Sequence, residues 1–220
     1  MKILILTGNG ALVGASFYNE VIKTLNKKHN KIYDKEFPEI VLYNLPLDVN
    51  NLGKLNPFDL KVLKNKLFEI NNLNIDYLFV LCNSISQDIE DIINTNKFNF
   101  KFINIIKNTL AKTSNLNKEI IFCSEYTNNQ KIYGKNLNYL EKKEQNIINK
   151  IIDNILKGDN NIEELKLITK YLKENNIENI ILGCTELYFI KNIFNSNEFN
   201  VYDSLTLYKD CLINIILNEN

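Results

Sequence analysis

A short phrase occurs twice in this chain. Each copy runs from Asn-Ile and an acidic residue through an apolar segment to a cysteine and two further polar residues. The first copy is NIDYLFVLCNS at 74–84, and the second is NIENIILGCTE at 176–186. Each apolar run is typical of a fully buried parallel strand. Ligands of open α/β sheets bind at the carboxyl ends of the strands. The repeat therefore predicts two related halves that bring Cys82 and Cys184 to one small molecule.

Strand-like and helix-like segments alternate along the whole chain, which predicts an α/β fold with parallel sheets and helices on both faces. The apolar runs predict strands at 3–7, 39–43, 77–81, 102–105, 119–123, 179–182 and 200–202. Helical periodicity predicts helices at 15–27, 58–71, 141–156, 162–175 and 205–217. The repeat divides the chain into an N-terminal lobe at 1–95 and a C-terminal lobe at 96–203, with a closing helix at 204–220 that packs back on the first lobe.

Composition excludes several classes of function. The 26 basic and 26 acidic residues cancel, so nothing favours binding to nucleic acid or to an anionic membrane. No apolar segment approaches the ~20 residues that a membrane span needs. All the basic residues except His29 are lysine, so an anionic ligand must be held without a bidentate guanidinium. We expect a cytoplasmic protein with reduced thiols.

The four cysteines are Cys82, Cys123, Cys184 and Cys211, and none is part of a C-x-x-C motif. With His29 as the single histidine, this spacing argues against a zinc site. Polar residues of helix N-cap type follow Cys82 and Cys184, so we expect each thiol at a helix N-terminus, where its pKa is lowered. Cys123 and Cys211 are interpreted as small buried apolar residues.

Two loops at the same edge of the sheets are further candidates. Gly8 and Gly10 lie between a predicted strand and a predicted helix, where backbone N–H groups can bind an anion. The spacing does not match the dinucleotide fingerprint, and a plain turn is an equal alternative. The polar stretch SEYTNN brings Ser124 and Thr127 to the edge where the thiols are expected, although a solvated loop explains it equally well.

Several motifs together resemble the aspartate/glutamate racemase superfamily, and most closely its aspartate racemase branch. They are GNGALVGASFY near the start, LCNS around Cys82, LKG at 156–158, ILGCTEL at 181–187 and VYDS at 201–204. The resemblance covers essentially the whole chain. ILGCTEL is its most specific element, because the cell-wall glutamate racemases usually have His where this chain has Glu186.

The resemblance implies two Rossmann-like lobes related by pseudo-twofold symmetry, with the active site in the cleft between them. It implies racemisation without pyridoxal phosphate or metal, in which one of Cys82 and Cys184 removes the α-proton as thiolate and the other returns a proton to the opposite face. The expected partners are a small amino-acid or carboxylate substrate and a second copy of the chain in a homodimer. The residues implied in substrate binding are Asn9, Asn83, Ser84, Thr127, Lys157, Thr185 and Glu186, of which Lys157 approaches the distal carboxylate.

This sequence departs from the family pattern near the expected substrate. The family commonly has Pro-Asp-Arg where this chain has 47–49, Leu-Asp-Val, and the arginine assists the distal carboxylate. Ser86 replaces a usual histidine, Ala11 a usual proline, and Thr7 a common glycine. Two-base proton transfer is therefore better supported than the choice of a dicarboxylic amino acid.

The leading hypothesis is an amino-acid racemase with Cys82 and Cys184 as acid and base. Three alternatives remain open. One is another isomerase or a decarboxylase of the same superfamily, and another is an inactive homologue that binds a carboxylate. The last is a redox protein that forms a Cys82–Cys184 disulfide, which conflicts with the room that a substrate carbon needs between the sulfurs.

Overall fold

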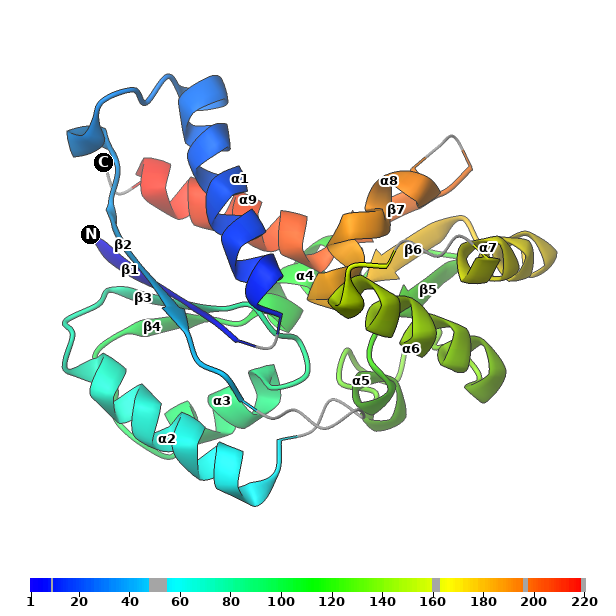
Figure 1. Cartoon of the computed structure of the whole chain (residues 1–220), viewed down its shortest axis with the longest axis horizontal. Helices are drawn as coiled ribbons and strands as arrows, with labels where there is room; N and C mark the ends of the chain where they lie inside the picture. The colour runs from blue at the N-terminus through cyan, green and yellow to red at the C-terminus, as the bar shows by residue number, and fades with distance from the viewer. Residues whose placement is uncertain (9, 48–54, 160–162, 196–197, 219–220) are drawn as a thin grey trace.

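The chain folds around two parallel β-sheets, as the computed structural model of residues 1–8, 10–47, 55–159, 163–195 and 198–218 shows (Figure 1). The first sheet has the strand order β2-β1-β3-β4, and the second has the order β5-β6-β7. The strands are β1 (Lys2–Thr7), β2 (Glu39–Asn44), β3 (Tyr77–Val80), β4 (Lys101–Ile103), β5 (Glu119–Phe122), β6 (Asn179–Leu182) and β7 (Asn200–Asp203). The predicted α/β class with parallel sheets is confirmed.

Helices cover both sheets (Figure 1). The α-helices are α1 (Ala11–His29), α2 (Pro57–Asn71), α3 (Ser86–Asn94), α4 (Ile105–Thr113), α5 (Glu125–Gln130), α6 (Lys142–Lys157), α7 (Glu163–Glu174), α8 (Lys191–Phe194) and α9 (Ser204–Asn218). Two short 3₁₀ helices are η1 (Asp34–Glu36) and η2 (Thr185–Ile190). In the described part of the chain, no helix is long and apolar enough to cross a membrane.

Alternate residues of each strand enter different hydrophobic cores, because successive side chains of a strand point to opposite faces. In β1, Ile3 and Ile5 enter a core shared by both sheets, while Leu4 and Leu6 enter an outer core with α2 and α3. In β6, Ile181 enters the shared core, and its neighbours enter a second outer core with α6 and α7. The shared core, which also contains side chains of α1, α4 and α9, joins the two sheets.

The repeated phrase folds in the same way in both copies. β3 and β6 occupy the same positions within it; β3 is one of the two inner strands of its sheet, and β6 is the central strand of the other. Each copy opens at an asparagine in the left-handed region, with φ of 50° at Asn74 and 53° at Asn176. Each strand ends with the same backbone bond, from Leu81 to the carbonyl of Leu6 at 2.9 Å and from Gly183 to the carbonyl of Phe122 at 2.8 Å. The two sheets are therefore equivalent halves, consistent with the expected pseudo-symmetry.

The second half has a reduced counterpart of the edge strand β2. β1 pairs with β2 on one side and with β3 on the other, and β5 pairs with β6 on one side. On its other side, β5 makes a single parallel bridge between Ile121 and Tyr139, closed by a 3.0 Å bond from Ile121 N to Asn138 O. The lobes are thus similar in plan, with the edge strand reduced to one bridge in the second.

Two local expectations need correction. β4 pairs with β3, so 101–103 belongs to the first sheet although the sequence placed it in the lobe at 96–203. The stretch SEYTNN was predicted as a loop, but it forms α5, because Ser124 caps the helix by accepting from the backbone N–H of Thr127. The closing helix α9 packs on α1 and α4. The division at residue 95 otherwise remains a prediction.

Candidate active site

Cys82 and Cys184 lie just beyond the carboxyl ends of the equivalent strands β3 and β6. The Cys184 side chain is buried, and Cys82 is partly exposed. The negative charge that Cys82 carries as thiolate is one of the causes that raise the pKa of Cys184, after burial and the contacts of Glu186. The two thiols therefore lie within electrostatic range of each other, at the edge of the sheets where the sequence predicted a ligand.

The expected low pKa is wrong for Cys184. Burial, followed by the negative charge of Glu186, raises the pKa of this thiol well above its ordinary value. Cys184 does precede a helix as predicted, but η2 is a short 3₁₀ helix and its N-terminus does not offset burial. In the resting protein Cys184 is therefore a thiol, which is the form that a general acid needs.

Glu186 is the partner of that thiol. The Cys184 thiol donates to Oε2 of Glu186 at 3.0 Å, and the Thr185 hydroxyl donates to the same oxygen at 3.2 Å. Burial raises the pKa of Glu186, while the bonds from Cys184 and Thr185 oppose this effect. The resemblance placed Thr185 and Glu186 in the substrate site. In the structure Glu186 accepts from both Cys184 and Thr185.

Asn83 is held by two residues that the sequence did not assign to the site. The Tyr133 hydroxyl donates to Oδ1 of Asn83 at 2.5 Å, and Nδ2 of Asn83 donates to Oγ of Ser204 at 3.3 Å. All three side chains are buried. Ser204 belongs to the VYDS motif, but the motif alone gave it no role. Tyr133 carries no local sequence signal, because its position depends on the packing of the two halves.

Three hydroxyl groups from both halves form a cluster next to Asn83. Oγ of Ser84 lies 2.9 Å from Oγ of Ser124 and 3.3 Å from Oγ1 of Thr127. Ser124 in turn donates to Oγ1 of Thr127 at 3.1 Å. Ser84 follows Cys82, and the other two residues belong to the N-terminal turn of α5. The structure therefore brings together Ser84 and Thr127, two residues that the resemblance assigned to one substrate site.

The turn that contains Gly8 and Gly10, before α1, lies next to Glu186, the partner of Cys184. A Cβ atom at Gly10 would lie 2.4 Å from Oε1 of Glu186, and one at Gly8 would lie 1.7 Å from the carbonyl oxygen of Leu45. Both glycines have positive φ, 138° at Gly8 and 105° at Gly10. The predicted anion-binding turn thus faces a carboxylate of the protein itself. Asn9, the remaining residue of this turn, lies outside the described residues.

No protein-family model matches the chain, and no curated protein matches it. Solved structures do match. An aspartate racemase from Picrophilus torridus is 18% identical with a TM-score of 0.72, over 98% of this chain and 94% of that chain. An aspartate racemase homologue from Pyrococcus horikoshii OT3 is 22% identical with a TM-score of 0.73, over 98% and 99%. A candidate Asp/Glu racemase from Yersinia pestis is 18% identical with a TM-score of 0.76, over 99% and 100%.

The chain has the fold of these proteins. This racemase fold consists of the two sheets with their flanking helices, and it spans nearly the full length of both partners in each match. Identities this low establish the fold alone. The candidate site was built from the geometry of this chain, and its residues lie at the carboxyl edge of both sheets of the racemase fold.

The structure does not place Lys157 in this cluster, and it does not describe the stretch at 48–49. Lys157 is exposed at the C-terminal end of α6, whose next residue, Gly158, caps the helix with a φ of 74°. α6 packs against η2, so the helix as a whole adjoins the segment after Cys184. Val49, at the position where the racemase pattern has arginine, lies outside the described residues, as does Asp48. The contact of Lys157 with a distal carboxylate therefore stays a prediction.

The other two cysteines take no part in the side-chain hydrogen bonds described above, although Cys123 directly precedes Ser124 and its charge as thiolate contributes to the raised pKa of Tyr133. Cys123 is fully buried in the shared core, and burial raises the pKa of its thiol. Cys211 lies in α9, and burial raises its pKa as well. Within the described ranges, no group of three or more His, Cys, Asp or Glu side chains is arranged to hold a metal ion.

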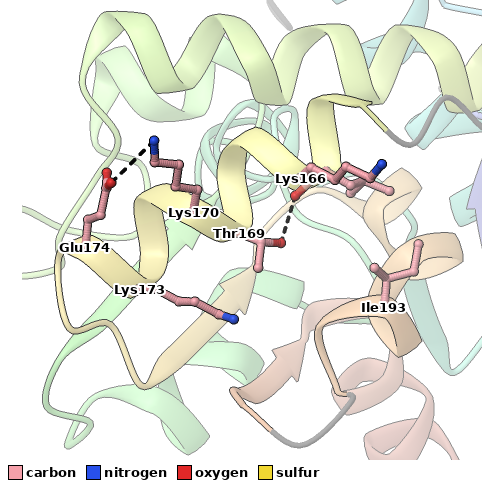
Figure 2. Close-up of a pocket in the computed structure, with 7 residues that line it drawn as sticks. Lys166, Thr169, Lys170, Lys173, Glu174 and Ile193 are labelled. Carbon is pink, nitrogen blue, oxygen red and sulfur yellow. Dashed lines mark hydrogen bonds and ion pairs between the residues drawn. The ribbon is translucent and has the colours of Figure 1, made fainter.

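A hollow of about 400 Å³ between α7 and α8 contains none of the predicted site residues (Figure 2). Its walls are largely apolar and include Ile193 and the stems of lysines on α7. The ammonium groups of Lys170 and Lys173 pair with Glu174 at 3.7 Å and Glu198 at 2.7 Å. This hollow therefore lacks the thiols and the buried polar groups that characterise the site at the sheet edge.

Proposed function

We propose that this protein is a cofactor-independent amino-acid racemase that interconverts L- and D-enantiomers by proton transfer at Cα. The observation that carries the proposal is the pair of thiols at equivalent positions of two equivalent halves. Two opposed groups of one chemical kind suit a reaction that is the same in both directions. The shared fold with aspartate racemases supports it.

In the proposed mechanism, Cys82 as thiolate removes the α-proton from one face, and the Cys184 thiol protonates the opposite face. The reverse reaction exchanges these roles. Asn83, Ser84 and Thr185 are proposed to hold the α-carboxylate, with Asn9 and Thr127 lining the site. Lys157 is proposed to reach a distal carboxylate, which makes aspartate and glutamate the first substrates to test. We also propose a homodimer that acts in the cytoplasm.

Isotope exchange in deuterated water tests the activity. We expect single enantiomers of aspartate or glutamate to lose their α-proton by NMR and to gain the opposite configuration by chiral chromatography. Cys82→Ala and Cys184→Ala should each lower racemisation by about 10²–10⁴-fold, the usual contribution of a general acid or base. Cys123→Ala should keep the activity, and Cys211→Ala is a second control at a less buried thiol.

The outcomes separate the proposal from its alternatives. Absence of α-exchange with every amino acid tested would contradict a racemase. Release of CO₂ from a malonate-type acid would indicate a decarboxylase, and thermal stabilisation by a carboxylate without exchange would indicate an inactive binding protein. A reversible disulfide between Cys82 and Cys184 would indicate a redox protein. Light scattering that gives the mass of one chain would contradict the homodimer.

A further inference from the structure

The two thiols have different partners although their surroundings are repeated. In the repeated phrase, Ser84 occupies the position that Glu186 occupies in the second copy. Ser84 bonds to hydroxyl groups of the other half, at 2.9 Å from Ser124. Glu186 turns back and accepts the thiol proton of Cys184 at 3.0 Å. The second thiol thus has an ionisable partner at a position where the first copy has serine.

The carboxylate of Glu186 lies at the start of a long helix. Gly10 is the N-cap of α1, and Oε1 of Glu186 occupies the space that a Cβ of Gly10 would need, 2.4 Å away. The partial positive charge at a helix N-terminus favours a carboxylate there. The same carboxylate accepts from Thr185 at 3.2 Å. Glu186 is therefore held in a fixed place, with one oxygen toward Cys184 and the other toward α1.

Racemisation requires Cys184 to act as a base in one of the two directions. Simple loss of its proton to solvent would leave a buried thiolate next to a buried carboxylate, an arrangement that like charges disfavour. The other titratable groups that face Cys184 do not stabilise its thiolate. Cys82 raises the pKa of Cys184 further, and the buried hydroxyl of Tyr133 has a pKa raised chiefly by burial.

We propose that Glu186 is a positioning residue that takes the proton of Cys184 and thereby lets this buried thiol act as a base. The S–H bond breaks, its electron pair stays on sulfur, and an O–H bond forms at Oε2, so the net charge of the pair is unchanged. When Cys184 and Glu186 share one proton, the pair can act as the base. After the Cys184 sulfur takes the α-proton, the two side chains hold two protons, and the pair is the acid for the reverse reaction. The proposal rests on the racemase function proposed above.

The pH dependence of alkylation tests the pair without any need for activity. Wild type, Glu186→Gln and the exposed control Glu174→Gln are treated with iodoacetamide, and the Cys184 peptide is quantified by mass spectrometry. In the wild type, transfer to Glu186 forms thiolate without loss of a proton to solvent, so the alkylation rate should be constant over a range around neutral pH. Glutamine cannot take the proton, so in Glu186→Gln the rate should rise about tenfold per pH unit.

Racemisation gives a second pH profile. In Glu186→Gln the rate should fall on the order of 10²-fold at neutral pH and then rise with pH, because Cys184 must exchange its proton with solvent. Glu174→Gln should follow the wild type. Identical alkylation profiles in wild type and Glu186→Gln would overturn the shared proton. If the wild type does not racemise any amino acid, the proposed function fails, and the alkylation profile alone still decides the pair.

Discussion

At the scale of single residues, the amide of Asn83 has one orientation that satisfies its neighbours. The Tyr133 hydroxyl donates to its oxygen at 2.5 Å, so its nitrogen faces Oγ of Ser204 at 3.3 Å. An amide nitrogen carries two protons, and the second can serve a carboxylate ligand. We therefore expect Tyr133 to act on the proposed substrate through Asn83. The sequence predicted Asn83, but a partner 50 residues away is brought to it only by the tertiary fold.

Replacing Tyr133 by phenylalanine should separate binding from chemistry. The change leaves a buried amide oxygen without its donor, which costs about 1–3 kcal/mol in the free energy of unfolding. We expect KM for the amino acid to rise about tenfold, equivalent to about 1.4 kcal/mol, while kcat changes less. Urea unfolding and initial-rate kinetics measure the two effects. Tyr18→Phe, at a partly exposed tyrosine of α1, is the matched control, and an unaltered KM in Tyr133→Phe would exclude this role for Tyr133.

At the scale of elements, the sequence predicted the inner strands best. β6 has the predicted bounds, and β3 ends one residue early, because long apolar runs between polar turns leave little choice. A helix start after Cys82 was expected from the polar residues that follow it, but no bounds were predicted for this helix. α3 begins at Ser86 without a side-chain cap, so it lacks the usual N-terminal signal. α5 was interpreted as a loop because its short polar sequence resembles one. It is stabilised by the hydrogen bonds of Ser124 with the buried Thr127.

The left-handed asparagine before β6 should be replaceable by glycine and not by alanine. Asn176 has a φ of 53° and follows α7, a position where glycine and asparagine are the usual residues. Asn176→Ala should lower the free energy of unfolding by about 1 kcal/mol, because Cβ disfavours this region. Asn176→Gly should leave it within about 0.5 kcal/mol. Urea unfolding measures both, and equal stability of the two variants would contradict the argument.

At the scale of the whole molecule, the repeat predicted two equivalent halves but not how they are joined. A shared core between the sheets brings Ser84 next to α5 and Tyr133 next to Asn83. Such contacts depend on packing between distant segments, which a single sequence does not specify. Cys184 is buried in the outer core of the second half, and this burial raises its pKa, the opposite of what its place before a helix predicted. The sequence thus pointed to the two thiols as candidates, whereas the protonation of Cys184 depends on the tertiary structure.

Burial of weak acids throughout the cores should make the protein sensitive to alkaline pH. Burial raises the pKa of Cys123, Cys184, Tyr133 and Tyr208. Above about pH 8.5 the unfolded chain releases thiol protons that the folded chain keeps, so stability is present below that pH and declines above it. Each such thiol should contribute a slope of about 1.4 kcal/mol per pH unit. Cys123→Ala removes one of these protons, although it also creates a small cavity. Between about pH 9 and 10, the free energy of unfolding of this variant should therefore fall less steeply than that of the wild type. Urea unfolding under reducing conditions measures both. A slope equal to that of the wild type would show that Cys123 does not keep its proton in the folded protein.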